Sequence, residues 1–152
     1  MTTALITGGL GFIGSSICDE LLKKNYSSKC ILVDNFGGYM NPIKEGFVDF
    51  RKQRFKSLKN IVIERCDTSN YKALSSIINK YKPKYIYHTA ALPLAKVSNL
   101  NNDEAKISSV DSTVNIIDAI NLLKSSNKKF QFDRFIYFSS SMVYGDFEKS
   151  SV

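Results

Sequence analysis

The feature that most constrains the fold is a regular alternation of short apolar runs with segments of helical periodicity. Each apolar run is bounded by polar or turn residues and predicts a strand. Strands that are apolar along their whole length are typical of parallel sheets covered on both faces. The predicted strands are Thr3–Thr7, Cys30–Asp34, Ile61–Glu64, Tyr85–His88 and Arg134–Ser140.

Helical spacing of apolar residues occupies the segments between these runs. After the first strand, Ile13, Ile17 and Leu21 recur every four residues and form one face of a helix. Strand and helix alternate along all 152 residues, which predicts one domain with a doubly wound parallel α/β sheet and helices on both faces. Further helices are expected in a basic stretch that ends near Leu58, over Tyr71–Tyr81, and from about Asp103 to Leu123.

The connection between the first strand and the first helix is rich in glycine. The sequence TGGLGFIG places Gly8, Gly11 and Gly14 in the spacing GxxGxxG. Glycine lets the chain turn tightly and lets backbone N–H groups approach a phosphate, toward which the next helix points its positive N-terminus. Glycine-rich turns also have purely structural roles, so the spacing alone is a weak indication. Its position between a strand and a helix favours the dinucleotide site of a Rossmann fold.

An acidic residue at the end of the second strand supports this interpretation. Asp34 follows Gly14 by 20 residues, which is the usual separation of about 20 for the carboxylate that binds the ribose hydroxyls of adenosine. A carboxylate there would repel a 2′-phosphate, so the sequence predicts NAD rather than NADP. The alternative is that Asp34 only caps the turn in the sequence VDN.

These motifs and three others resemble the extended short-chain dehydrogenases/reductases, the branch that contains nucleotide-sugar epimerases and dehydratases. TGGLGFIG matches the TGxxGxxG of that family, and VDNF, CDTSN, HTAA and SSSMVYGD follow in the family's order along the whole chain. The resemblance implies that the chain is the NAD-binding N-terminal half of such an enzyme. The cofactor-binding residues that it implies are Gly8, Gly11, Phe12, Ile13, Gly14, Asp34, Asn35, Asp67, Thr68, Thr89, Ala90 and Ala91.

The resemblance also implies a reaction on a nucleotide sugar, in which NAD takes a hydride, often from carbon 4. Ser140 stands where the family has the serine or threonine that hydrogen-bonds the reacting hydroxyl, although it could simply cap the strand end. Dehydratases of the family carry Asp and Glu at the next two positions, which here are Ser141 and Met142. This difference favours an epimerase, with another dehydratase or reductase of the family as an alternative.

The catalytic Tyr-x-x-x-Lys pair of the family is absent from the 152 residues. We therefore expect a fragment, truncated after the fifth strand and inactive alone, or else a non-catalytic NAD(H)-binding module. The family's N-V-x-G-T pattern is also altered, because Ser109 and Ser112 stand at its Asn and Gly positions. His88 is the only histidine, and the resemblance favours a structural role at the end of the fourth strand over a catalytic one.

Composition excludes several other classes of protein. The net charge of +7 comes from scattered lysines, and the one dense cluster, Arg51–Lys56, is interpreted as a solvated helix face rather than a nucleic-acid site. The three cysteines match no metal motif, which predicts reduced thiols and a cytoplasmic protein without a metal. No membrane partner is expected, because no signal peptide or membrane-spanning run is found. The fifth strand would leave an exposed apolar edge, so we expect a homo-oligomer or self-association.

Overall fold

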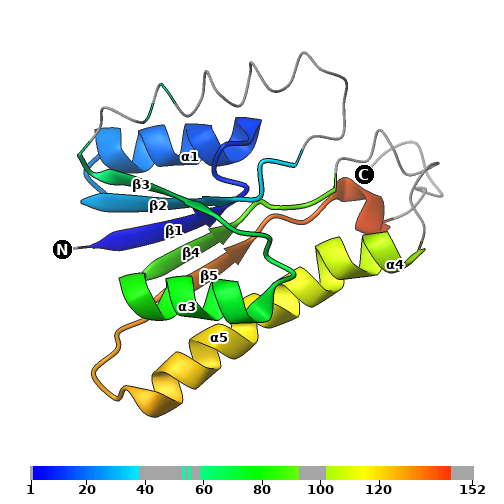
Figure 1. Cartoon of the computed structure of the whole chain (residues 1–152). Coiled ribbons are helices and arrows are strands. Elements are labelled where there is room, and N and C mark those ends of the chain that lie inside the picture. The colour runs from blue at the N-terminus through cyan, green and yellow to red at the C-terminus, as the bar shows by residue number, and fades with distance from the viewer. Residues whose placement is uncertain (1, 38–52, 54, 56–58, 93–101, 145–152) are drawn as a thin grey trace.

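The computed structural model describes residues 2–37, 53, 55, 59–92 and 102–144, and its described strands form one parallel sheet (Figure 1). The order across the sheet is β3-β2-β1-β4-β5. The chain therefore moves outward from β1 in one direction and then in the other, which confirms the predicted doubly wound Rossmann sheet. The strands are β1 (Thr3–Thr7), β2 (Lys29–Asp34), β3 (Ile61–Arg65), β4 (Tyr85–His88) and β5 (Arg134–Tyr137).

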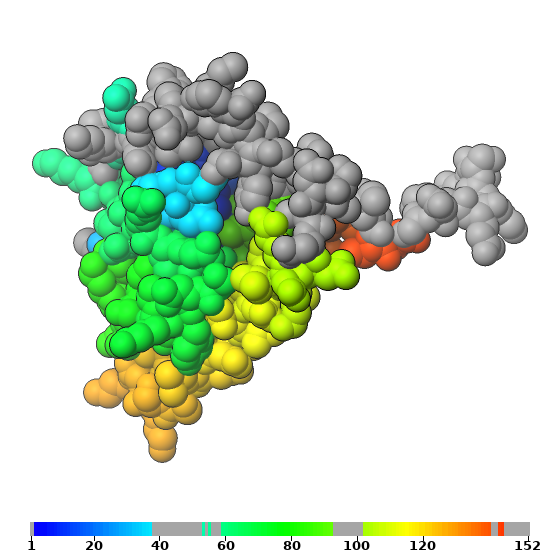
Figure 2. Space-filling model, turned by 45° about the vertical axis from the view of Figure 1, so that its right-hand side comes forward, coloured from blue at the N-terminus to red at the C-terminus, as the bar shows by residue number. Residues whose placement is uncertain are grey.

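Helices cover both faces of the sheet. Alternate residues of β1 point to opposite sides, so that Ile6 packs toward the face covered by α1 (Phe12–Lys23) and Leu5 toward the other face. That second face is covered by α3 (Tyr71–Tyr81) and α5 (Ser112–Ser126), which lie against each other in Figure 2, in green and yellow. The central strands β1 and β2 are buried along most of their length, as their continuous apolar sequences predict, whereas the edge strands β3 and β5 are only partly buried.

The predicted long helix is divided into three parts. It begins as α4 (Asn102–Ala105), continues with the wider π-helical winding of η2 (Lys106–Asp111), and becomes α-helical again in α5. The hydroxyls of Ser108, Ser112 and Thr113 donate to the carbonyl oxygens of residues four positions earlier, at 2.6–2.8 Å. Such bonds compete with the backbone ladder of an α-helix, and no apolar pattern indicates them in advance.

The fifth strand is shorter than predicted. Its pairing with β4 runs from Tyr85 opposite Arg134 to His88 opposite Tyr137, and it ends where β4 ends. The N–H of Phe138 still donates to the carbonyl of His88 at 3.2 Å, and the chain then leads into a 3₁₀ turn, η3 (Ser141–Tyr144). Among the described strands, β5 forms one edge of the sheet and β3 the other.

The basic helix expected to end near Leu58 and the cluster Arg51–Lys56 lie outside the described residues, apart from Gln53 and Phe55. Cys18, Cys30 and Cys66 are buried thiols that form no disulfide, in agreement with the prediction of reduced thiols. Within the described part of the chain, no helix is both long enough and apolar enough to cross a membrane.

Candidate functional site

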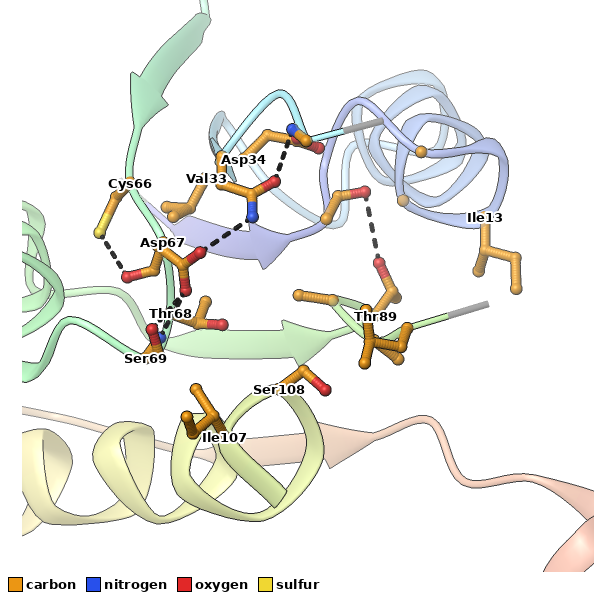
Figure 3. Close-up of a pocket in the computed structure, with 18 of the residues that line it drawn as sticks. Ile13, Val33, Asp34, Cys66, Asp67, Thr68, Ser69, Thr89, Ile107 and Ser108 are labelled. Carbon is orange, nitrogen blue, oxygen red and sulfur yellow. Dashed lines mark hydrogen bonds between the residues drawn. The ribbon is translucent and has the colours of Figure 1, made fainter. Parts of the chain in front are cut away.

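A pocket of about 730 Å³ opens at the carboxyl ends of β1, β2, β3 and β4 (Figure 3). Asp34, Asp67 and Thr68 lie toward one end of the pocket, and Ile13 and Thr89 lie toward the other. The carboxyl ends of strands beside a reversal of strand order are where doubly wound sheets bind their ligands. All twelve residues predicted to bind the cofactor line this pocket: Gly8, Gly11, Phe12, Ile13, Gly14, Asp34, Asn35, Asp67, Thr68, Thr89, Ala90 and Ala91.

The glycine turn is too crowded for side chains. Gly8 has a left-handed backbone, with φ of +64°, and a Cβ added there would lie 2.9 Å from the backbone nitrogen of Ala90. A Cβ on Gly14 would lie only 2.3 Å from the carbonyl oxygen of Gly8. The turn, the start of α1 and the end of β4 can therefore approach one another this closely only with glycine at these positions.

The backbone N–H groups of this turn are divided into two sets. Those of Gly9, Leu10 and Gly11 donate to acceptors within the protein, namely the carbonyls of Val33 and Gly8 and the carboxylate of Asp34. The first hydrogen bond within α1 is donated by the N–H of Ser15, so the N–H groups of residues 12–14 have no intrahelical acceptor. No side chain caps this end of α1, and its positive dipole faces the pocket.

Asp34 connects the second strand to the glycine turn. One carboxylate oxygen accepts from the N–H of Leu10 at 3.0 Å, and the other accepts from the N–H of Phe36 at 2.9 Å. Asp34 therefore caps its own turn, as the alternative interpretation predicted, and it also lines the pocket. Each oxygen keeps lone pairs for a further donor, so the two roles are compatible.

Asp67 lies in the turn between β3 and α3 and is held by three donors. Its carboxylate accepts from the side-chain amide of Asn35 at 3.0 Å and from the N–H and hydroxyl of Ser69 at 2.9 Å and 2.7 Å. Partial burial opposes ionisation, but these hydrogen bonds outweigh it and lower the pKa of Asp67 below its usual value. The pocket therefore presents an ionised, fixed hydrogen-bond acceptor at this end.

The end of β4 is fastened to β1. The hydroxyl of Thr89 donates to the carbonyl of Thr7 at 2.6 Å, and the N–H of Ala90 donates to the hydroxyl of Thr7 at 3.3 Å. The small residues Ala90 and Ala91 then form part of the pocket wall. A larger side chain would reduce the space between this wall and the glycine turn.

His88 is buried at the end of β4 and is not among the residues that line the pocket. The residue is 1% exposed, and burial lowers the pKa of its imidazole to about 4, so the ring is neutral near neutral pH. The hydroxyls of Ser112 and Thr113 donate to backbone carbonyls and can only accept from Nε2, at 3.4 Å and 3.2 Å. The proton is therefore on Nε2, and Nδ1 accepts from the hydroxyl of Thr7 at 2.6 Å.

Comparison with known proteins identifies the family. The model of the GDP-mannose 4,6-dehydratase family matches residues 5–152 of the chain. The chain belongs to this family. It is a family of NAD-dependent nucleotide-sugar epimerases and dehydratases of the short-chain dehydrogenase/reductase type, as the motifs predicted.

Individual relatives match along nearly the whole chain. Protein CapI of Staphylococcus aureus is 32% identical over 143 residues, which are 93% of this chain and 38% of CapI. The dTDP-D-glucose 4,6-dehydratase of Dictyostelium discoideum is 31% identical over 141 residues, which are 93% of this chain and 29% of that enzyme. This chain thus spans less than two fifths of the length of either relative.

A solved structure confirms the fold. UDP-glucose-4-epimerase from Stenotrophomonas maltophila, crystallised with bound NAD and formylated UDP-arabinopyranose, superposes with a TM-score of 0.75 at 19% identity. The superposition covers 100% of this chain and 41% of the epimerase. At this identity the likeness establishes the Rossmann fold and nothing finer.

Ser140, the predicted catalytic residue of this family member, is not among the residues that line the pocket. It lies three positions after the end of β5, and its carbonyl accepts from the N–H of Val143 at 3.2 Å in η3. Its side chain is partly buried. The structure therefore places Ser140 after the end of the strand next to β4, and not among the pocket-lining residues.

Eight lining residues were not predicted. Five of them, Val33, Gly37, Cys66, Ser69 and Leu92, lie within two residues of a predicted one, and extending each motif would have found them. Glu104, Ile107 and Ser108 come from α4 and η2, where no motif of the family indicated a contact. Among the described lining residues the charged ones, Asp34, Asp67 and Glu104, are all acidic.

Proposed function

We propose that residues 1–152 bind NAD and form the cofactor half of a nucleotide-sugar epimerase. The observation that carries this proposal is that all twelve residues chosen from four separate motifs line one pocket. Its volume of about 730 Å³ lies within the roughly 300–1,000 Å³ that small-molecule pockets occupy. The chain covers only 38% of CapI and 29% of the dTDP-D-glucose 4,6-dehydratase. This supports the proposal that it is one half of an enzyme rather than a whole one.

The start of α1 fits the diphosphate of NAD. The N–H groups of Phe12, Ile13 and Gly14 have no acceptor within the helix, and they lie at the positive end of its dipole. The missing side chains at Gly8 and Gly14 let a phosphate approach this backbone closely. No lysine or arginine is found among the described lining residues, so the backbone would supply the positive field for the anion.

The other end of the pocket fits adenosine. Asp34 lines the pocket, and each of its carboxylate oxygens can accept a further hydrogen bond from a ribose hydroxyl. Asp67 offers an ionised acceptor for the exocyclic amino group of adenine, and Thr68 and Ile107 add partly apolar surface. The carboxylate of Asp34 would repel a 2′-phosphate, which supports NAD over NADP.

The chemistry that NAD supplies when bound is the removal and return of a hydride. Ser140 can donate and accept a hydrogen bond at a sugar hydroxyl, which is the role that its position in the V-Y-G motif implies. Ser141 and Met142 carry no acid or base that works near neutral pH, where dehydratases have Asp and Glu. We therefore propose epimerisation, at carbon 4 of the sugar, rather than dehydration.

A second candidate is a non-catalytic NAD(H)-binding module. It is favoured by one observation, the absence of a Tyr-x-x-x-Lys sequence from the 152 residues. Without this pair the chain has no base of the family's kind for the sugar hydroxyl.

Isothermal titration calorimetry with NAD⁺ tests the binding proposal. We expect the chain to bind NAD⁺ and Asp34→Ala to weaken binding strongly, because the ribose loses its acceptor. Asp118→Ala is the matched control, since Asp118 is exposed on α5 and does not line the pocket. Unchanged affinity in Asp34→Ala would contradict the ribose assignment.

Turnover separates the two candidates. UDP-sugar interconversion is assayed with the chain alone and after adding a separately produced C-terminal half of an epimerase relative. Turnover only in the second case supports the epimerase proposal. Binding of NAD⁺ without turnover in both cases supports the non-catalytic module.

A further inference from the structure

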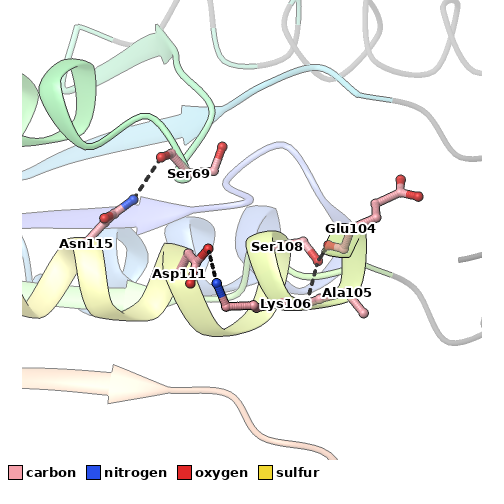
Figure 4. Close-up of polar contacts among 7 residues, drawn as sticks. All are labelled: Ser69, Glu104, Ala105, Lys106, Ser108, Asp111 and Asn115. Atoms are coloured by element: carbon pink, nitrogen blue, oxygen red, sulfur yellow. Dashed lines mark hydrogen bonds and ion pairs between the residues drawn. The ribbon is translucent and has the colours of Figure 1, made fainter. Parts of the chain in front are cut away.

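Asn115 of α5 joins two parts of the chain that are far apart in sequence. Its side-chain amide nitrogen donates to the carbonyl of Thr68 at 3.0 Å. The same nitrogen donates to the carbonyl of Ser69 at 2.9 Å, the contact drawn in Figure 4. An amide nitrogen carries two hydrogens, so one group satisfies both carbonyls. The opposite orientation of the amide would bring its oxygen against two carbonyl oxygens, which fixes the assignment.

The turn that Asn115 holds is a wall of the pocket. Asp67, Thr68 and Ser69 line the pocket, whereas Asn115 is not among the lining residues. Ser69 in turn orients Asp67, because its N–H and its hydroxyl both donate to the same carboxylate oxygen. A continuous series of hydrogen bonds therefore runs from Asn115 through Ser69 to the carboxylate that faces the pocket.

The position of this turn in the fold explains why it needs such a contact. It follows β3, an edge strand that pairs only with β2 among the described strands. The turn has one internal backbone bond, from the N–H of Asn70 to the carbonyl of Asp67 at 3.0 Å. Asn115 adds two hydrogen bonds to this turn from α5. The helix is itself held in the core by Ile116 and Ile120.

We propose that Asn115 is a positioning residue for adenine recognition. It holds the turn after β3 so that the carboxylate of Asp67 accepts a hydrogen bond from the exocyclic amino group of adenine. The inference rests on the proposed function, which is that this pocket binds NAD. It assigns a role to a residue that lies outside the pocket and outside the five motifs.

The recognition is tested with two dinucleotides. Calorimetry compares NAD⁺ with its hypoxanthine analogue, whose exocyclic group is a carbonyl oxygen that accepts and cannot donate a hydrogen bond to Asp67. We expect the wild-type chain to prefer NAD⁺ by about tenfold or more, the range of one charge-assisted hydrogen bond. Asn115→Leu has a similar size but no donor, and we expect its NAD⁺ affinity to fall about tenfold while the analogue is affected little. The ratio of the two affinities then approaches one.

Two further variants keep the test decisive. Asn121→Leu is the same substitution at an exposed position of the same helix, and we expect wild-type values for both dinucleotides. Asn115→Ser retains a polar group that is too short to reach both carbonyls, and it should reproduce the loss of discrimination if the leucine variant does not fold.

Several results would overturn the inference. One is a ratio of NAD⁺ affinity to analogue affinity in either Asn115 variant that equals the wild-type ratio. Another is an equal loss of affinity for both dinucleotides in these variants. A third is failure of both variants to fold, which would assign Asn115 to folding alone. A wild-type chain that binds both dinucleotides equally overturns this inference and leaves the proposed function intact. A wild-type chain that binds neither overturns the proposed function itself.

Discussion

Thr7 and His88 lie opposite each other at the ends of β1 and β4, and the hydroxyl of Thr7 donates to Nδ1 of His88 at 2.6 Å. The same hydroxyl accepts from the N–H of Ala90, and Nε2 of His88 donates to the hydroxyl of Thr113 at the start of α5. One buried imidazole therefore ties together two strands and a helix behind the pocket. Protonation of that imidazole would bury a positive charge. Among the described residues, the hydrogen-bond partners of the ring are hydroxyls and not carboxylates.

The first prediction concerns pH and stability. Burial lowers the pKa of His88 to about 4 from 6.5, so between these values the unfolded chain binds a proton that the folded chain does not. The free energy of unfolding should therefore decrease as the pH falls from 6.5. We expect a loss of about 2 kcal/mol by a pH of about 5, measured by urea denaturation.

His88→Asn provides the control for this prediction. The amide keeps a donor and an acceptor but does not titrate, so the free energy of unfolding should stay constant over the same pH range. Glu64 and Asp67 also have lowered pKa values, but their contributions are lost only at more acidic pH, below the usual pKa of a carboxyl. A wild-type chain as insensitive to pH as the variant would contradict the prediction.

The second prediction concerns the crowding at Gly14. Alanine normally stabilises a helix relative to glycine. Here its Cβ would lie 2.3 Å from the carbonyl oxygen of Gly8, and the turn must move to admit it. Gly14→Ala should destabilise the chain by about 1–3 kcal/mol, as in other overpacked sites, and should also weaken NAD⁺ binding.

Thermal unfolding and calorimetry measure the two effects of Gly14→Ala. The matched control is Ser16→Ala, two residues later on the exposed side of α1, where we expect a change within about 0.5 kcal/mol and unaltered binding. If Gly14→Ala proved as stable as the wild-type chain, the close approach of the glycine turn to α1 would be wrong.

The sequence predicted the sheet well because the signal for each strand is local. The runs of residues 4–6 and 30–33 are apolar at every position, and only a strand covered on both faces buries all of them. Four motifs at the carboxyl ends of the first four strands then predicted the pocket, because topology brings those ends to one edge of the sheet.

The features that were missed depend on contacts between distant residues. β5 ends at Tyr137, opposite the end of its partner at His88, although the apolar Phe138 follows. The π-helical winding of η2 is accompanied by hydroxyl-to-carbonyl hydrogen bonds that apolar spacing does not reveal. The contribution of Glu104 and Ile107 to the pocket depends on how that helix crosses the sheet, which a motif cannot specify.

The third prediction concerns the choice between NAD and NADP. Asp34→Asn keeps the size of the side chain and one oxygen acceptor for the glycine turn, but it removes the negative charge. We expect calorimetry to show that the wild-type chain strongly prefers NAD⁺ over NADP⁺, and that Asp34→Asn reduces the preference at least about tenfold, because like-charge repulsion of the 2′-phosphate disappears. Equal affinity of the wild-type chain for both dinucleotides would refute the electrostatic role of Asp34.

The last prediction concerns the edge of the sheet at β5. Tyr137 is 49% exposed and Phe138 is 39% exposed, so this edge combines strand backbone with apolar surface. Such an edge favours pairing with a second copy, and a lysine on it opposes pairing. Size-exclusion chromatography at tens of micromolar should show association of the wild-type chain and a shift of Tyr137→Lys toward the monomer. Tyr26→Lys, at a 66% exposed position away from the edge, should behave as the wild type, and a monomeric wild-type chain would rule out association through β5.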